Sequence, residues 1–295
     1  MKKLICTFMA LFLMITLVAC NQNTEGSKKE KTEEKKPIIA VSIVPEKEWV
    51  EAVVGDFADV TVMIPPGKSP ANYAPSPKEL QLFSDASVYF AIGVPTEKVN
   101  ILSKTKDINP NLKVVHLEQA AAEKYPERQF ESGKRDQHIF ISPKRIAVMV
   151  QEIEDTLSKE YPGQKEQFEK NAAAYIEKIE EADKEIKTIL AEVEAKKFIA
   201  YHPAFGYFAD DYGLEMIAIE KDGKEATPQR VQEIIDLAKT EDIHVIFYQA
   251  EIDSSQSKAI AEEIDGKTVQ IAPLAPDSVE NAKRMAQTFK NKMEK

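Results

Sequence analysis

Four histidines are the side chains of this 295-residue chain best suited to chemistry near neutral pH, and two of them stand where ligands usually bind. His202 follows the apolar run 198–201, which is typical of a strand, and His138 lies in a polar loop. Loops at the carboxyl ends of parallel strands commonly form ligand sites, and neutral imidazole is the commonest metal ligand in proteins. His116 and His244 flank predicted strands without such neighbours, so we interpret both as structural.

The loop 65–77 is a second candidate for a ligand site because it is dense in proline. Proline fixes the backbone angle φ, so the shape of this loop is set before any ligand arrives. We therefore favour a binding role over a packing role for the loop.

Several classes of function are disfavoured by what the chain lacks. It contains no Gly-x-Ser-x-Gly, no glycine-rich phosphate loop and no His-Glu-x-x-His, which are signatures of common enzymes. We predict that the protein is not an enzyme and has no catalytic cofactor, with a two-histidine hydrolytic site as the remaining enzymatic interpretation. The formal net charge of −10 argues against nucleic acid as a partner.

The elements that must position these loops follow a repeated pattern. Strand-like runs alternate with helix-like stretches, which predicts βαβ units and parallel sheets. The predicted strands fall into two sets: 38–43, 60–64, 88–92 and 114–116, then 198–201, 215–219, 243–248 and 268–271.

The segment 164–197 separates the two sets and has the composition of one long helix. It is rich in Glu, Lys and Ala, lacks Gly and Pro, and repeats apolar residues at steps of three, four or seven. Such spacing predicts an amphipathic helix of about 30 residues, roughly 45 Å long at 1.5 Å per residue. The fold class is therefore α/β, with two parallel-sheet lobes joined by one long helix.

Three helix starts are marked by a hydroxyl residue followed by proline: Ser76-Pro77, Ser142-Pro143 and Thr227-Pro228. The hydroxyl suits the N-cap position, and proline suits the first helical position. Glu79, three residues after Ser76, completes a predicted capping box.

The amino terminus predicts export from the cytoplasm. A positive start and an apolar run precede Leu-Val-Ala-Cys, which resembles a bacterial lipobox ending at Cys20. The apolar run is short for a transmembrane helix, which needs about 20 residues; an uncleaved membrane anchor is the alternative. Lipidation of Cys20 would consume the one cysteine after residue 19, which excludes a disulfide or a cysteine zinc site.

We divide the chain into a signal peptide (1–19), a lipidated cysteine and flexible tether (20–36), an N-terminal lobe (37–160), a linking helix (161–197) and a C-terminal lobe (198–295).

Five ordered segments resemble the zinc/manganese-type (TroA-like) solute-binding proteins. They are Pro-Pro-Gly to Pro-Ser-Pro at 65–77, Asp-Gln-His-Ile-Phe-Ile-Ser-Pro at 136–143, Tyr-His-Pro-Ala-Phe-Gly-Tyr-Phe at 201–208 with Asp-Tyr-Gly-Leu at 211–214, Glu-Ala-Thr-Pro at 225–228, and Ile246-Phe247. The resemblance runs from about residue 37 to the end. It implies a lipid-anchored, extracytoplasmic receptor on a bacterial cell membrane. Such a receptor binds zinc or manganese between its lobes and delivers the ion to an ABC permease and its ATPase.

The sequence departs from the family at two of the four expected ligands. Ala71 stands where the family usually has histidine, and Ala272 stands where it usually has aspartate. The resemblance therefore carries over only His138 and His202 as metal ligands, and two histidines alone bind zinc weakly. The histidine-rich loop of some zinc receptors is absent as well, since residues 119–137 contain no histidine.

Three interpretations of the pocket follow, and the sequence leaves all of them open. Nearby donors complete the metal site, for which Asn72, Tyr73, Glu251 and Asp277 are candidates. Alternatively, the pocket takes a metal chelate that brings its own ligands, or it holds an organic solute. An adhesin-type surface lipoprotein is the other class of function.

Overall fold

The computed structural model describes residues 35–221, 224–252 and 255–293. The predicted signal peptide, Cys20 and the tether up to residue 34 lie outside the described residues. Both predicted lobes belong to one compact unit, Lys36–Lys295.

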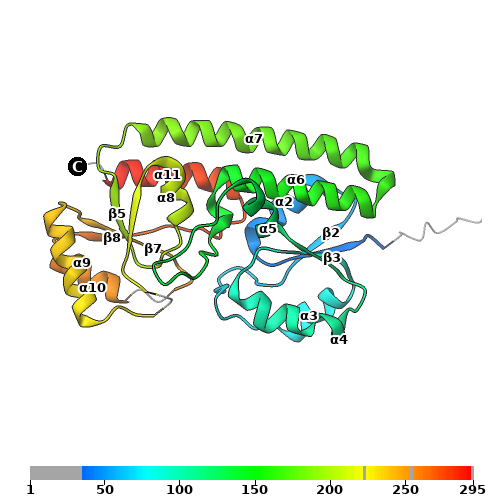
Figure 1. Ribbon diagram of the computed structural model, residues 1–295, viewed down its shortest axis with the longest axis horizontal. Helices are drawn as coiled ribbons and strands as arrows, with labels where there is room; N and C mark the ends of the chain where they lie inside the picture. Colours follow the sequence, from blue (N-terminus) through cyan, green and yellow to red (C-terminus); the bar gives the residue numbers. More distant parts are fainter. Residues whose placement is uncertain (1–34, 222–223, 253–254, 294–295) are drawn as a thin grey trace, which may run out of the picture. The chain divides into compact units, whose positions relative to one another are not determined.

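Two four-stranded parallel sheets form the frame of this unit, one before and one after a long helix (Figure 1). The strands are β1 (Ile38–Val41), β2 (Asp59–Val62), β3 (Ala86–Ala91), β4 (Lys113–His116), β5 (Lys197–Ala200), β6 (Glu215–Ala218), β7 (Val245–Tyr248) and β8 (Lys267–Gln270). The strand orders are β2-β1-β3-β4 and β6-β5-β7-β8. The second sheet thus repeats the order of the first, which confirms the predicted α/β fold of two lobes.

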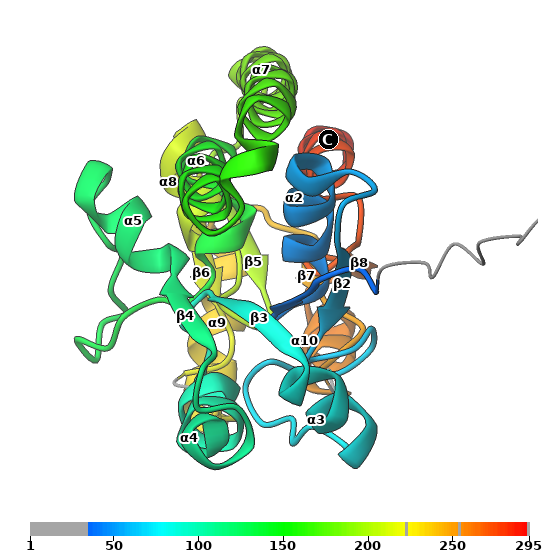
Figure 2. The same ribbon diagram turned by 90° about the vertical axis from the view of Figure 1, so that its right-hand side faces the viewer.

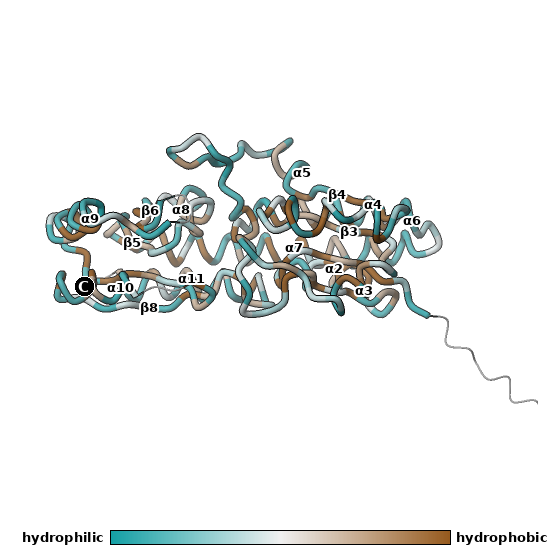
Figure 3. The backbone as a smooth tube through the Cα atoms, turned by 90° about the horizontal axis from the view of Figure 1, so that it is seen from below, coloured by the Kyte–Doolittle hydropathy of each residue, from teal (hydrophilic) through white to brown (hydrophobic). Residues whose placement is uncertain are grey.

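Helices cover both faces of each sheet (Figures 1 and 2). They are α2 (Val44–Val54), α3 (Pro77–Ser84), α4 (Thr105–Ile108), α5 (Leu117–Lys124), α6 (Pro143–Glu160), α7 (Lys165–Ala191), α8 (Gly206–Tyr212), α9 (Pro228–Thr240), α10 (Ser255–Glu263) and α11 (Ser278–Met293). Alternation along the strands explains this layering, because successive side chains point to opposite faces. In β1, Ile39 and Val41 join the cluster that contains α2 and α6, whereas Ala40 joins Phe83 of α3 on the other face. Figure 3 shows the outer turns as mostly hydrophilic.

The long helix α7 ends at Ala191, six residues before the predicted end at residue 197. The chain must leave the helix early because Lys197 pairs with Glu215 at the start of β5. Lys196 donates to the carbonyl oxygen of Leu190 at 3.4 Å, which satisfies one of the free carbonyls at this helix end.

One hydrophobic cluster runs through both lobes along α7. The buried face of α7 consists of Phe168, Ala172, Tyr175, Ile179, Ala182, Ile186 and Leu190. It packs against α6 of the first lobe and α11 of the second (Figure 1). The indole N–H of Trp49 in α2 also donates to the hydroxyl of Ser278 in α11 at 2.8 Å. The lobes therefore share a core and do not merely meet at a linker.

All three predicted helix starts form with the hydroxyl residue at the N-cap, and two of the hydroxyls make the capping hydrogen bond. The hydroxyl of Ser76 accepts from the backbone N–H of Glu79, and the side chain of Glu79 accepts from the backbone N–H of Ser76. Thr227 caps α9 by accepting from Arg230 at 3.3 Å. Ser142 is the N-cap residue of α6, but its hydroxyl donates to Asp211 of the other lobe at 2.5 Å and makes no capping hydrogen bond.

Within the described residues, no helix combines the length and the apolar character that a membrane span needs. The longest of them, α7, is amphipathic and uses its apolar face for packing.

Candidate metal site

The two predicted histidine ligands meet at the boundary between the lobes. His202 follows β5 of the second lobe, and His138 directly precedes a short 3-10 turn, Ile139–Ile141, in the first lobe. Their Nε2 atoms are 3.1 Å apart. Residues separated by 64 positions are therefore brought together by the packing of the two lobes.

Each histidine is held from behind by a carboxylate. The Nδ1 atom of His138 is 2.7 Å from Oδ1 of Asp136, and Nδ1 of His202 contacts Oε2 of Glu220. A carboxylate can only accept from a neutral imidazole, so these partners assign the ring proton to Nδ1 and leave a free lone pair on Nε2. This pairing of carboxylate with histidine is common around metal ions.

The free lone pairs of the two rings face each other. Two acceptor nitrogens 3.1 Å apart repel unless a cation or a proton lies between them. Tetrahedral zinc with Zn–N bonds of about 2.0–2.1 Å holds two nitrogens roughly 3.3 Å apart. The observed spacing is thus close to that of two ligands on one metal ion.

Burial keeps the first histidine neutral and its carboxylate charged. Burial lowers the pKa of His138, and this outweighs the opposite effect of its hydrogen bond to Asp136. Burial raises the pKa of Asp136, but the hydrogen bonds from the ring and the backbone N–H of His138 and the charge of the Arg128 guanidinium outweigh it, so that the pKa of Asp136 lies below its ordinary value. A neutral ring beside an ionised carboxylate is the state that suits a metal ligand.

A small cavity adjoins the histidine pair. Its volume is about 30 Å³, and its lining includes Pro70, Ala71, His138, His202, Gln249, Glu251 and Leu274. The Oε2 atom of Glu251 is buried and has no hydrogen-bond partner among the described residues, a state that costs free energy unless a ligand, ion or water satisfies it. A second cavity of about 260 Å³ shares Pro70, Glu251 and Leu274 with the first and is also lined by Ala272.

Only one of the four proposed substitute donors lies at this cavity. Glu251, which follows β7, lines it, whereas Asn72, Tyr73 and Asp277 do not. The hydroxyl of Tyr73 donates to Glu79 at 3.0 Å. Asp277 is engaged by the guanidinium of Arg284 at 2.7 and 2.8 Å.

The remaining histidines are held elsewhere. His116 contacts Glu118, and His244 contacts the carbonyl oxygen of Ile264 and the side chain of Asp242. Neither lines the cavity between the lobes.

Among residues 35–221, 224–252 and 255–293, no three His, Cys, Asp or Glu side chains stand together in a geometry that could hold a metal ion. The histidine pair thus stands without a third donor of these types in a metal-binding arrangement among the described residues. Sequence reasoning missed Asp136 and Glu220. Asp136 stands two residues before His138 in the sequence. Glu220 follows β6, which pairs with β5, the strand that precedes His202. Closeness to one of the two histidines could therefore have identified both carboxylates.

Comparison with known proteins points to one family. Residues 39–295 match the family described as zinc-uptake complex component A, periplasmic, or ZnuA. The zinc-binding lipoprotein AdcA of Streptococcus pneumoniae (strain ATCC BAA-255 / R6) is 32% identical over 96% of this chain and 57% of its own length. The chain thus spans about half the length of several curated relatives that it matches.

Other relatives are closer in length. The high-affinity zinc uptake system protein ZnuA of Bacillus subtilis (strain 168) is 29% identical over 88% of this chain and 84% of its own length. A crystal structure of ZnuA superimposes with a TM-score of 0.83, at 32% identity, over 88% of this chain and all of that one. The periplasmic zinc-binding protein TroA from Treponema pallidum, at 18% identity and a TM-score of 0.80, shares the fold.

Proposed function

Because the chain belongs to the ZnuA family of zinc-uptake components, we propose that it is the extracytoplasmic solute-binding receptor of an ABC importer. It captures a zinc ion between its lobes and delivers the ion to the permease and its ATPase. The observation that carries this proposal is the pair of Nε2 lone pairs facing each other at 3.1 Å across the lobe boundary.

Zinc suits these donors better than manganese does. Imidazole nitrogen favours zinc, whereas manganese prefers sites built from carboxylate, carbonyl and water oxygens. Relatives that match this chain are named for zinc binding or zinc uptake. The preference for zinc therefore rests on both the donor atoms and the relatives.

His138, His202 and Glu251 are the proposed protein ligands. Glu251 supports this assignment because its buried Oε2 atom has no partner within the part of the chain that the structure describes, and because it lines the cavity beside both histidines. Three protein donors leave the fourth tetrahedral position of zinc to water. An open position of this kind favours exchange of the ion, which a receptor that must release its cargo needs.

Stoichiometric binding, and not catalysis, is the proposed role. The family supplies transport receptors, and capture and release require no acid–base pair. Lipidation of Cys20 would tether the receptor to the membrane, with residues up to 36 as a flexible link to the lobes at 37–160 and 198–295. The linking segment 161–197 would keep the two lobes in register.

The test is calorimetric titration of the metal-free protein with zinc and with manganese at pH 7. We expect one zinc per chain, a weaker response to manganese, and loss of zinc binding in His138→Ala and in His202→Ala. His244→Ala is the matched control, because that ring lies outside the cavity. Zinc binding that survives in both site variants would contradict the proposal.

A zinc chelate is the second candidate ligand, and the cavity of about 260 Å³ beside Glu251 favours it. The cavity extends from the metal site toward Ala272, where the family usually has a ligand, and it offers room for a small organic molecule on the ion. Native mass spectrometry of protein purified without chelators distinguishes the two candidates. Bare zinc adds the mass of the ion alone, and a chelate adds the mass of its organic part.

A further inference from the structure

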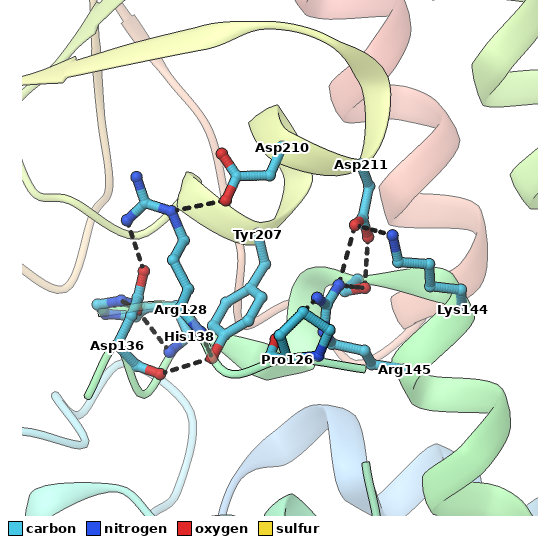
Figure 4. Close-up of polar contacts among 10 residues, drawn as sticks. Pro126, Arg128, Asp136, His138, Lys144, Arg145, Tyr207, Asp210 and Asp211 are labelled. Carbon is cyan, nitrogen blue, oxygen red and sulfur yellow. Dashed lines mark hydrogen bonds and ion pairs between the residues drawn. The ribbon is translucent and has the colours of Figure 1, made fainter. Parts of the chain in front are cut away.

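Arg128 bridges the two lobes beside the histidine pair (Figure 4). It belongs to a segment that we call the strap, residues 125–137, between α5 and the first histidine. Its Nε atom donates to Oδ2 of Asp210 at 3.0 Å, and its Nη1 atom donates to Oδ2 of Asp136 at 3.2 Å. Asp210 lies in α8 of the second lobe, whereas Asp136 supports His138 in the first. One guanidinium therefore contacts a carboxylate from each lobe.

Backbone contacts hold the strap in the same place. The backbone N–H of Asp136 donates to the carbonyl oxygen of Arg128 at 2.8 Å, so the two residues are fixed relative to each other. The hydroxyl of Tyr207 in α8 accepts from the backbone N–H of Arg128 at 2.9 Å and donates to the carbonyl oxygen of Asp136 at 3.2 Å (Figure 4). The strap and α8 thus meet through several hydrogen bonds next to His138.

Gly206, the first residue of α8, makes room for the guanidinium. A Cβ atom at this position would lie 2.5 Å from Cζ of Arg128, which is too close for real atoms. The φ angle of Gly206 is not in the left-handed region, so the backbone itself would accept alanine. The need for glycine therefore comes from the close approach of Arg128 across the lobe boundary.

The two halves of the bridge differ in exposure. The side chain of Asp136 is fully buried, whereas that of Asp210 is 58% exposed. Exposed ion pairs contribute little, about 0–1 kcal/mol, so the contact to Asp210 can break and reform. The contact to Asp136 stays with the first lobe. This asymmetry is what a reversible connection between the strap and α8 requires.

We propose that Arg128 is a positioning residue that latches the strap to α8 when the lobes are closed. The latch holds His138 in front of His202 through Asp136 and so slows release of the metal ion. This inference rests on the proposed function for its effect on zinc, but the latch itself is a property of the metal-free protein and can be tested there.

The first arm of the test measures zinc release to an excess of chelator by stopped flow. Arg128→Gln and Gly206→Ala break the bridge in two independent ways, by removing the guanidinium or by displacing it. We expect both to release zinc about two- to fivefold faster, because each variant breaks one partly exposed ion pair and leaves Asp136 behind His138 in place. The double variant should be no faster than either single one, because both remove the same contact.

Arg128→Lys separates a bridging role from a purely electrostatic one. Lysine keeps the positive charge, but its single nitrogen cannot take the two separate positions from which Nε and Nη1 of Arg128 donate to Asp210 and Asp136. We expect Arg128→Lys to release zinc nearly as fast as Arg128→Gln. If Arg128→Lys released zinc at the wild-type rate, the proposed latch would be refuted. Glu131→Gln is the matched control, since the pair of Glu131 with Lys221 also crosses between the lobes but is highly exposed.

The second arm measures hydrogen–deuterium exchange of the metal-free protein. Arg128→Gln and Gly206→Ala should speed exchange in the strap and in α8, and Glu131→Gln should leave both unchanged. Unchanged exchange in the two latch variants would overturn the latch whatever the zinc result. A wild-type protein that binds no zinc would instead refute the proposed function, and this arm would still decide the latch.

Discussion

At the scale of single residues, the proposed zinc site depends on the histidine pair and its carboxylate partners. Asp136 and Glu220 hold the rings of His138 and His202, whereas Ala71 and Ala272 offer no donor. The partners matter because a ring whose second nitrogen is hydrogen-bonded is already oriented before the ion arrives. The proposed site therefore relies on a small number of donors, the two histidine rings, whose orientation is fixed in advance.

Restoring a donor at position 71 should strengthen zinc binding. Ala71 lines the cavity, so Ala71→His places an imidazole within reach of the ion. We expect zinc affinity to rise by at least about tenfold, or about 1.4 kcal/mol, in calorimetric titration. Asn72→His is the control, because Asn72 lies in the same turn but does not line the cavity. An equal gain in the control would show that the effect is not coordination at this site.

A buried carboxylate in the first lobe should make stability depend on pH. Burial raises the pKa of Glu97 to about 7, against the effect of hydrogen bonds from Ser42, Ile92 and Gly93. The folded state thus binds this proton more tightly than the unfolded state, whose pKa is about 4.3. The stability gained from the proton is fully present below about pH 4 and is lost as pH rises through 7, with a total of about 4 kcal/mol.

The measurement is urea unfolding of metal-free protein between pH 5 and pH 8.5, compared with Glu97→Gln. The wild type should lose stability with rising pH more steeply than the variant, because glutamine carries no proton to lose. The pKa of Glu46 is also raised by burial. The pH dependence of the unfolding free energy that Glu46 contributes is therefore the same in the wild type and in the variant. Parallel pH profiles would contradict the assignment of the slope to Glu97.

At the scale of elements, the sequence predicts the helices, strands and caps that depend on neighbouring residues. It does not predict features that depend on contacts between residues far apart in the chain. The eight strands and the long helix follow from apolar spacing, and the caps at Ser76 and Thr227 follow from the residue types at the helix starts. Ser142 has the same local signal, but Asp211, 69 residues away, takes its hydroxyl. Glu251 could not be chosen among the four candidate donors, because only the assembled sheets show which loops meet.

The two capping hydrogen bonds should each contribute to stability. Ser76→Ala removes the acceptor for the Glu79 N–H, and Thr227→Ala removes the acceptor for the Arg230 N–H. We expect each variant to lose about 1 kcal/mol of unfolding free energy in urea denaturation. Ser84→Ala, at the opposite end of α3, is the control and should change stability by less than about 0.5 kcal/mol. Equal losses in the three variants would argue against a capping effect.

At the scale of the whole molecule, the shared core determines how the lobes can move. The cluster along α7 contains buried residues of both lobes, so a wide separation of the lobes would expose apolar surface. Motions that leave this cluster intact are confined to segments outside it, such as the strap and the loop that carries Glu251, because residues of α8 belong to the cluster. Small rearrangements there are consistent with a receptor that must hold an ion and then release it.

The shared core also predicts that the two lobes unfold together. Phe289 of α11 is fully buried and its ring contacts Phe198, Phe205, Phe208 and Phe247, all in the second lobe. Phe289→Ala should cost about 3–5 kcal/mol, because it leaves a cavity among these rings. Trp49, the one tryptophan of the chain, lies in α2 of the first lobe and donates to Ser278 of α11, so its fluorescence reports on the first lobe and on this junction.

We expect Phe289→Ala to shift the urea midpoint seen by Trp49 as far as the midpoint seen by circular dichroism, because coincident transitions are the mark of cooperative unfolding. Val99→Ala is the control, since Val99 is 67% exposed and should move neither midpoint. If the lobes were independent, the fluorescence of Trp49 would keep its wild-type midpoint while circular dichroism split into two steps. Coincident shifts would show that α7 and α11 join the lobes into one folding unit, whose remaining freedom is concentrated at the metal site.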